Sequence, residues 1–362
     1  MSVGFRKGRT IHAESAFLTG LSILLLLFSV QVQASVGDQL PEFRECVKLC
    51  VRENCGTNAT PIPLHRRFLL WDCPAECDYT CQHIITAQRL TVDPPQPVVQ
   101  FHGKWPFRRL WGMQEPFSVL CSLGNLWAHV HGLRHHVRAA IPASYPLRPY
   151  YETLARIGIA TWLFSAIFHT RDFVLTERLD YFAAGASVLY GLYYSVVRLF
   201  RLYDYPRVPR AQSRRQTLLR AWTVLCLSLY AAHVGFLTFI RWDYGYNMAA
   251  NVAVGSVQNV LWAWYTWQQW RRQKRRQQLR SEVRSRKLSD SWTFWPGVVV
   301  AWVLAAMSLE LFDFPPLWGI FDAHGLWHLG TIAPAVLWYN FLVKDAAEDM
   351  ASTERSKARN RY

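Results

Sequence analysis

Two histidines near the C-terminus, His324 and His328, have the spacing of a metal-binding pair. They lie in the stretch FDAHGLWHLG, at the start of an apolar segment that continues to Val343. Residues four apart lie on one face of a helix, with β-carbons about 5–6 Å apart, so both imidazoles can bind one ion. Three-histidine sites with an open fourth position are typical of catalytic zinc. The spacing therefore predicts part of a zinc site.

Three further polar residues in apolar surroundings are candidates for the same site. His169 ends one apolar segment, Ser165 lies one helical turn before it, and Asp180 begins the next segment. Each has a simpler interpretation: an interfacial histidine, a packing serine, or a carboxylate interacting with a helix dipole. Ionisable side chains at membrane depth are costly, however, and are therefore usually functional. We expect them at one membrane face with the histidine pair, which favours His169 as the third metal ligand.

This set of residues predicts hydrolysis. Zinc on three neutral imidazoles lowers the pKa of a bound water to about 7. Asp180 would accept the proton of that water and return it to the leaving group, and Ser165 would orient a ligand or help bind an oxyanion. A centre at the membrane boundary meets lipid esters and amides more readily than soluble substrates. The residues alone therefore predict a lipid hydrolase.

The elements that must position these residues are apolar segments of about twenty residues, the length that crosses a membrane as a helix. Seven such segments follow residue 113, at 116–133, 150–168, 180–199, 217–240, 246–269, 292–311 and 325–343. The predicted fold class is an all-α membrane protein with seven transmembrane helices.

The charges of the loops orient these spans. The loops after the first, third and fifth segments are basic, most of all 271–287, whereas the other loops are short and balanced or acidic. The positive-inside rule then predicts a lumenal N-terminus, a membrane domain at 114–344 and a cytosolic tail at 345–362. The net charge of +15 is accounted for by these loops and gives no reason to expect a nucleic-acid partner.

The N-terminus predicts entry into an oxidising lumen. Residues 1–34 contain a basic region, an apolar run and a small-residue cleavage site, as secretory signal peptides do. An uncleaved anchor helix is the alternative, and in either case the next segment, 35–113, is lumenal. Asn58 begins a glycosylation sequon that is usable only on that side.

Segment 35–113 carries six of the eight cysteines: Cys46, Cys50, Cys55, Cys73, Cys77 and Cys81. Their density predicts a disulfide-rich lumenal module. Six cysteines allow 15 pairings, and the sequence does not choose among them. A zinc ribbon is the rival interpretation. It is disfavoured because the C-x3-C spacings are not paired C-x2-C motifs and because the segment is expected in the lumen.

The remaining histidines of the membrane domain fit the site less well. Four are expected at the cytosolic end of the first span, on the wrong side for the cluster: His129, His131, His135 and His136. His233 lies two turns from the lumenal end of the fourth span, where either a supporting or a packing role is reasonable.

Four stretches of the sequence resemble a known family. They are FHGKWPFRRLWGMQEP (101–116), SAIFHTRDFVLTERLDYF (165–182), IRWDYGYNMAANVAVG (240–255) and LELFDFPPLWGIFDAHGLWH (309–328). They are similar to the post-GPI-attachment-to-proteins phospholipase family, whose fungal members are called "processing in the endoplasmic reticulum" proteins. This family belongs to a superfamily that also holds alkaline ceramidases and the adiponectin and progestin receptors.

The resemblance implies a site and an activity. The superfamily pattern is a serine and a histidine four apart in the second span, an aspartate in the third and H-x3-H in the seventh. It corresponds here to Ser165, His169, Asp180, His324 and His328. The implied activity removes the unsaturated sn-2 acyl chain from GPI-anchored proteins to give lyso-GPI, in the membrane of the endoplasmic reticulum or the Golgi.

Two alternatives stay open. A ceramidase-like lipid amidase would use the same metal centre on another lipid, although the large lumenal module favours a substrate that carries protein or glycan. A non-enzymatic seven-span receptor or metal-homeostasis protein would use His169, His324 and His328 as structural or transport ligands.

Overall fold

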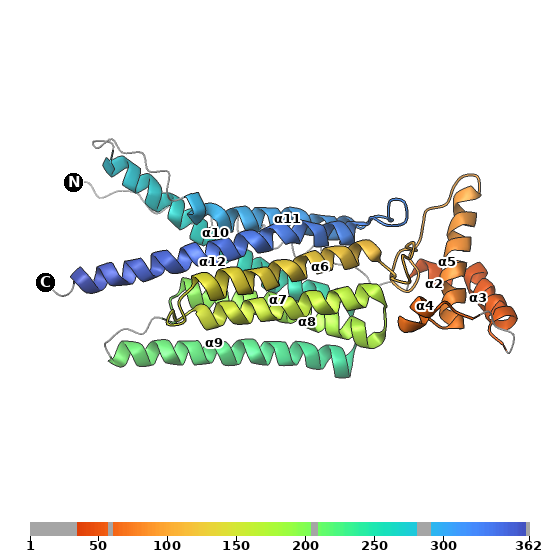
Figure 1. The fold of residues 1–362 in the computed structure, drawn as a ribbon, viewed down its shortest axis with the longest axis horizontal. Coiled ribbons are helices and arrows are strands. Elements are labelled where there is room, and N and C mark those ends of the chain that lie inside the picture. Colours follow the sequence, from red (N-terminus) through yellow and green to blue (C-terminus); the bar gives the residue numbers. More distant parts are fainter. Residues whose placement is uncertain (1–34, 57–60, 204–208, 281–290, 360–362) are drawn as a thin grey trace, which may run out of the picture.

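The computed structural model describes residues 35–359 except 57–60, 204–208 and 281–290, and shows a small helical module at one end of a long helical bundle (Figure 1). The predicted signal peptide, 1–34, and the sequon at Asn58 lie outside the described residues.

The N-terminal module is built on two antiparallel helices joined by disulfides. Its described helices are α2 (Val36–Gln39), α3 (Pro41–Asn54), α4 (Leu64–Phe68) and α5 (Cys73–Thr91). The disulfides are Cys46–Cys81, Cys50–Cys77 and Cys55–Cys73. Successive cysteines toward the C-terminal end of α3 are bonded to successive cysteines toward the N-terminal end of α5. The three disulfides therefore join the two antiparallel helices along their lengths. A disulfide-rich module is therefore present, and no thiolates of these six cysteines remain for a zinc ribbon.

The rest of the described chain forms seven long helices that coincide with the seven apolar segments of the sequence. They are α6 (Pro116–His131), α7 (Arg148–Thr170), α8 (Val174–Leu199), α9 (Pro209–Gly235), α10 (Tyr244–Arg280), α11 (Trp295–Phe312) and α12 (Ala323–Arg359). Short segments extend three of them: η1 (Gly132–Arg138) after α6, η2 (Phe236–Ile240) after α9 and η3 (Ser291–Phe294) before α11.

Among the described residues, three helical segments are long and apolar enough to cross a membrane by length and composition alone: Arg214–Ile240, Trp292–Phe312 and Ala323–Arg355. Polar residues dilute the apolar character of other helices; α7 begins with Arg148, Glu152 and Arg156, and α8 carries Glu177 and Asp180. The chain is an all-α membrane protein, and the full set of seven spans stays a prediction.

Six helices of the bundle pack in a ring: α6, α7, α8, α10, α11 and α12 each contact the next, and α12 contacts α6. Helix α9 packs against α8 on the outside of this ring (Figure 1). A dense aromatic core of Tyr151, Tyr194, Trp262, Tyr339 and neighbouring residues fills the end of the ring away from the module. The other end therefore carries less apolar packing and is free to hold polar residues.

Two segments differ from the sequence prediction. The basic segment 271–287 is not a loop throughout, because residues 271–280 continue helix α10. The predicted boundary at residue 344 falls inside a helix, since α12 runs to Arg359, and Asp345 of the predicted tail is buried. Arg198 of α8 donates to both carboxylate oxygens of Asp345, at 2.6 and 2.7 Å. This ion pair ties the start of the tail to the ring.

One turn, Phe101–Lys104, connects the module to the bundle. Phe101 lies in the core of the module. The backbone N–H of His102 donates to Asp38 at 2.9 Å, and the His102 ring lies 2.8 Å from Asp78. Lys104, at the far side of the turn, bonds to Glu115 just before α6 at 2.5 Å. The module thereby holds a lysine at the mouth of the bundle.

We expect the stability of the module to depend on pH through His102. Its hydrogen bond to Asp78 raises the pKa of His102 above the ordinary value, although burial opposes this. Because the folded pKa is raised, the stabilisation is complete below the unfolded pKa of about 6.5 and is lost as pH rises through the folded pKa. The side chain is 57% exposed, so solvent screening limits the effect to at most about 1 kcal/mol.

The measurement is the difference in free energy of unfolding between wild type and His102→Gln, followed from about pH 6 to pH 9 by denaturant titration without reductant. This difference should shrink as pH rises. His65→Gln, at an exposed histidine of α4, is the matched control and should show no such trend. A difference that does not vary with pH would contradict the role of His102.

Candidate metal centre

Three histidines from two helices meet at the module end of the bundle. His169 is in the last turn of α7, and His324 and His328 are in the first turns of α12. One nitrogen from each lies within 4.8 Å of the others, and the Nε2 atoms of His169 and His324 are 3.3 Å apart. His169 and His328 are buried, at 2% and 3% exposure. The structure thus brings together the three histidines that the sequence singled out.

The start of α12 is shaped to present the histidine pair. Asp322 caps the helix, because its side chain accepts the backbone N–H of Gly325 at 2.9 Å. A β-carbon at Gly325 would lie 2.6 Å from the Phe117 ring on α6 and 2.9 Å from Asp322 Oδ1. Glycine at this position therefore lets α12 approach α6 closely, which places the first turn of α12 against the other helices of the site.

Each histidine is held through its Nδ1 atom by a different side chain. Nδ1 of His169 lies 2.7 Å from Glu115 and Nδ1 of His324 lies 2.7 Å from Glu310. A carboxylate that accepts Nδ1–H fixes the tautomer and leaves the lone pair on Nε2 for a metal.

Nδ1 of His328 lies 3.1 Å from the Ser122 hydroxyl. Across the cluster, the two carboxylate-held histidines have Nε2 atoms that face each other at 3.3 Å. Two lone pairs at this distance repel unless a cation or a proton lies between them. The donor set therefore fits a bound metal ion.

Glu115 is anchored from the side of the N-terminal module. Burial by itself would raise the pKa of Glu115, but the positive charge of Lys104 and the hydrogen bond with His169 hold it well below its usual range. Lys104 also pairs with Asp172 at 3.2 Å and lies 3.9 Å from the centre of the Phe168 ring. Glu115 is therefore a charged carboxylate whose position depends on the lysine that the module holds.

Serine and aspartate occupy different places in the site. Ser165 is buried, and its hydroxyl is 3.0 Å from that of Ser122, which in turn contacts His328. Asp180 is half-buried and interacts electrostatically with His324. In the described part of the chain it makes no hydrogen bond to the three histidines. Ser165 is thus connected to the cluster through Ser122, whereas Asp180 faces it without direct contact.

The remaining histidines stay outside the cluster. Nδ1 of His129 is 2.8 Å from the hydroxyl of Tyr339, which belongs to the aromatic core at the far end. His131 stacks on Trp127 and lies against His135 and His136.

His233 lies 3.4 Å from the hydroxyl of Tyr246 on α10. The metal-competent histidine group among the described residues does not include any of these five side chains.

Sequence reasoning missed the supporting residues Glu115, Glu310 and Ser122. Glu310 carried a signal, because it is an ionisable residue inside the predicted span 292–311. Glu115 immediately precedes the first span and looked like an ordinary loop carboxylate. Ser122 is a serine in a span, a residue type that packs helices more often than it supports a site.

The fold and the cluster define a class: an all-helical membrane protein with a largely buried three-histidine cluster, two of whose members are held by carboxylates, at one end of its bundle. The family follows from comparison with known proteins. The model of the Per1-like family matches residues 63–346, and the chain belongs to this family. This confirms the resemblance carried by the four sequence stretches.

Curated relatives match over most of their lengths. The chain is 38% identical to "Protein PER1 homolog" of Schizosaccharomyces pombe, over 88% of this chain and 90% of the relative. It is 36% identical to "GPI-specific phospholipase A2-like PGAP3" of Danio rerio, with 92% and 98% covered, and to the protein of that name from Homo sapiens, with 91% and 96% covered.

We expect Glu310→Gln and Glu115→Gln each to weaken metal binding by about 10–100-fold, as the loss of a partner behind a ligand histidine usually does. A neutral amide accepts the Nδ1–H less strongly and no longer fixes which nitrogen carries the proton. Metal affinity is measured by competition with a chelator on the purified protein. The matched control is Glu152→Gln, which pairs with Arg148 at the other end of α7. Unchanged affinity in both glutamate variants would rule out this supporting role.

Proposed function

We propose that this protein is a metal-dependent phospholipase A2 that acts on GPI anchors, releasing the sn-2 acyl chain to leave lyso-GPI. The observation that best supports this proposal is the three-histidine cluster at the end of the bundle that meets the N-terminal module. The printed names of the relatives, which describe GPI-specific phospholipase A2-like proteins, support the choice of substrate. The endoplasmic reticulum is the compartment that the predicted signal peptide and the disulfides favour.

Zinc is the proposed metal, with His169, His324 and His328 as its ligands. When bound, zinc supplies a Lewis acid and water that ionises near neutral pH. The chain supplies the geometry: Glu115 and Glu310 orient two of the imidazoles, and His169 and His328 are buried.

Asp180 is the proposed general base and acid. It lies on the first turns of α8, half-buried, where it interacts with His324 but is not bound to it. A carboxylate in that position is free to take a proton from the attacking water and to deliver it to the leaving glycerol oxygen. Ser165 and Ser122 form a hydroxyl pair beside His328 that can orient the ester or donate to a developing oxyanion.

The position of the module favours a GPI anchor over ceramide. Through Lys104 and its partner Glu115, the module reaches to the residues that surround the cluster. A lipid processed there must therefore place its head group against the module. A glycan-linked lipid that carries a protein uses such a surface, whereas ceramide has only a small hydroxylated head group.

The test uses purified protein in lipid nanodiscs, supplied separately with a diacyl GPI and with a long-chain ceramide. We expect free fatty acid and lyso-GPI from the first and no sphingoid base from the second, measured by mass spectrometry. Cells that lack the protein should accumulate diacyl GPI anchors. Release of sphingoid base with no lyso-GPI would support the ceramidase alternative, and no product from either lipid would contradict both.

A further inference from the structure

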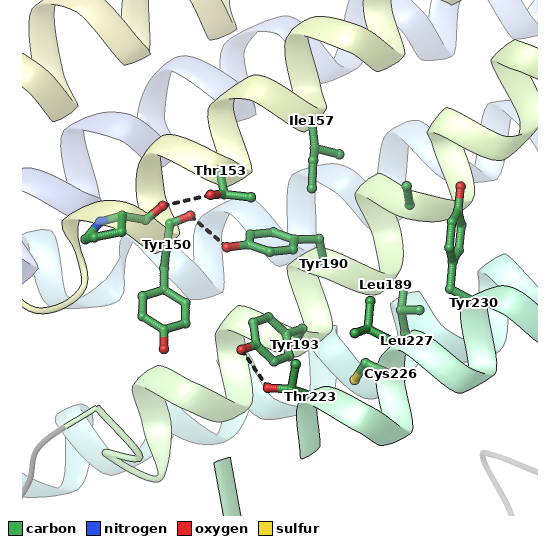
Figure 2. A pocket seen from close by; sticks show the side chains of 12 residues that line it. Tyr150, Thr153, Ile157, Leu189, Tyr190, Tyr193, Thr223, Cys226, Leu227 and Tyr230 are labelled. Carbon is green, nitrogen blue, oxygen red and sulfur yellow. Dashed lines mark hydrogen bonds between the residues drawn. The ribbon is translucent and has the colours of Figure 1, made fainter. Parts of the chain in front are cut away.

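A cavity of about 470 Å³ lies between α7, α8 and α9, away from the histidine cluster. Residues 149–157 of α7, 186–193 of α8 and 223–230 of α9 line it (Figure 2). Except for Pro149, these lining residues fall inside the predicted second, third and fourth spans. On α7, the lining residues belong to the half of the helix opposite His169. On α7, the cavity therefore lies toward the helix end away from the proposed active centre, whereas on α8 and α9 it lies near the middle of the predicted spans.

Hydrogen bonds between α8 and α9 frame this cavity. On one side, the hydroxyl groups of Tyr193 and Thr223 are 3.0 Å apart, and the Trp222 indole donates to the Tyr193 carbonyl at 3.2 Å. On the other side, Tyr230 donates to the carbonyl of Phe182 at 2.9 Å. Helix α9, which lies outside the ring, is thus hydrogen-bonded to α8 at two places along its length. The cavity lies between these two places.

The lining offers almost no polarity to an occupant. Tyr190 donates its hydroxyl to the carbonyl of Tyr150 at 3.1 Å, and Thr153 donates to that of Pro149 at 2.9 Å (Figure 2). The hydroxyls of Tyr193, Thr223 and Tyr230 are likewise bonded within the protein. The lining includes no charged side chain. An occupant must therefore be apolar where it contacts the protein.

The apolar lining and the volume of the cavity favour a hydrocarbon chain as its occupant. Water is disfavoured, because an apolar cavity without free polar partners stays dry. A partner helix, about 10–12 Å in diameter, does not fit such a volume. A free fatty acid that placed its carboxylate inside the cavity would find neither a cation nor a free hydrogen-bond donor in the lining. A phospholipid can insert one chain and leave its head group outside, at the membrane surface.

A direct contact between α7 and α8 lies between the cavity and the histidine cluster. Between the two, Thr161 of α7 is buried and donates to the carbonyl of Ala183 on α8 at 3.0 Å. This contact joins α7 and α8 directly, between Ile157 of the lining and Ser165 of the site. The lining residues and the site residues therefore form separate groups along α7.

We propose that this cavity binds one acyl chain of a membrane phospholipid. The chain fills the gap between α9 and the α7–α8 pair, and it replaces the side-chain packing that α9 lacks there. The site is independent of the proposed phospholipase activity, because none of its lining residues belongs to the metal centre.

The test is photo-crosslinking in nanodiscs that contain phosphatidylcholine with a diazirine on one acyl chain, followed by peptide mass spectrometry. Adducts should concentrate on the lining segments of α7, α8 and α9. Ala186→Trp fills the cavity and should reduce these adducts several-fold. Leu229→Trp adds the same ring at an exposed position of α9 that does not line the cavity, and it should leave them unchanged.

Two results would overturn the proposal. Equal labelling in wild type and Ala186→Trp would show that the lipid does not enter the cavity. If a photoreactive free fatty acid labels the same peptides as strongly as the phosphatidylcholine, the bound chain does not need to come from a phospholipid, and that part of the proposal is wrong.

A second measurement needs no substitution in the cavity. Cys226 is a free, buried thiol in the lining. A membrane-soluble maleimide should alkylate it faster in bilayers of methyl-branched chains, which fit the cavity poorly, than in bilayers of straight chains. Alkylation of Cys121, a buried free thiol on α6, is the internal control and should proceed at equal rates in both lipids. Equal rates at Cys226 would contradict occupancy by a lipid chain.

Discussion

His324→Ala should remove the bound metal and abolish the release of fatty acid from GPI. His324 is the proposed ligand in the first turn of α12 whose Nε2 lies 3.3 Å from that of His169, with Glu310 behind it at 2.7 Å. Without this imidazole two histidines remain. The Glu310 carboxylate then keeps, among the described residues, the hydroxyl of Tyr244 at 3.4 Å as its hydrogen-bond partner. We expect the activity to fall by more than about 100-fold, beyond the loss caused by removing a supporting partner.

The measurement pairs metal analysis of purified protein with GPI lipid composition in the same cells. Wild type should hold about one zinc ion per chain, as a single three-histidine site does. His131→Ala is the matched control, because His131 stacks on Trp127 at the opposite end of the bundle. It should keep both metal and activity. Equal metal content in wild type and His324→Ala would count decisively against the ligand assignment.

Asp180→Asn should keep the metal and lose turnover. The amide has the shape of the carboxylate but cannot take a proton at neutral pH, so the loss should be that of a general acid–base group, about 10²–10⁴-fold. In the described chain Asp180 makes no hydrogen bond to the three histidines, so its replacement should leave their arrangement intact. This separation of metal binding from turnover is what distinguishes an enzyme from a receptor or a metal-homeostasis protein.

The assay is lyso-GPI formation at saturating substrate, with metal content and thermal unfolding measured in parallel. Asp172→Asn provides a matched control, because Asp172 lies at the same end of the bundle but pairs with Lys104. It should retain more activity than Asp180→Asn. Normal lyso-GPI formation by Asp180→Asn would remove the catalytic role assigned to Asp180 and would favour a non-enzymatic function.

Much of this architecture is encoded locally and could be read from the sequence. Apolar segments of about twenty residues predict helices wherever they occur, and each of the seven became a long helix of the described chain. The i,i+4 spacing of His324 and His328 already determines that they share a helix face. The loop charges then selected His169 and set aside His131 and its neighbours, which do lie at the other end of the bundle.

Helix ends were harder to predict. The basic run after residue 270 has no local signal that stops α10, since arginine, lysine and glutamine are good helix formers. Residues 271–280 therefore continue the helix. The tail after residue 344 likewise stays helical, and its Asp345 finds Arg198 on another helix, a partner that no local pattern could reveal.

Taken alone, the sequence determined the helical class, the cysteine-rich module and the pair of histidines able to share a metal, because each depends on composition or on spacing within one helix. Only the tertiary structure decided the cysteine pairing and the supports behind the histidines. The disulfides depend on α3 and α5 lying antiparallel. Glu115 and Glu310 reach His169 and His324 from other segments of the chain. Such contacts join residues far apart in sequence, so they exist only once the helices have packed.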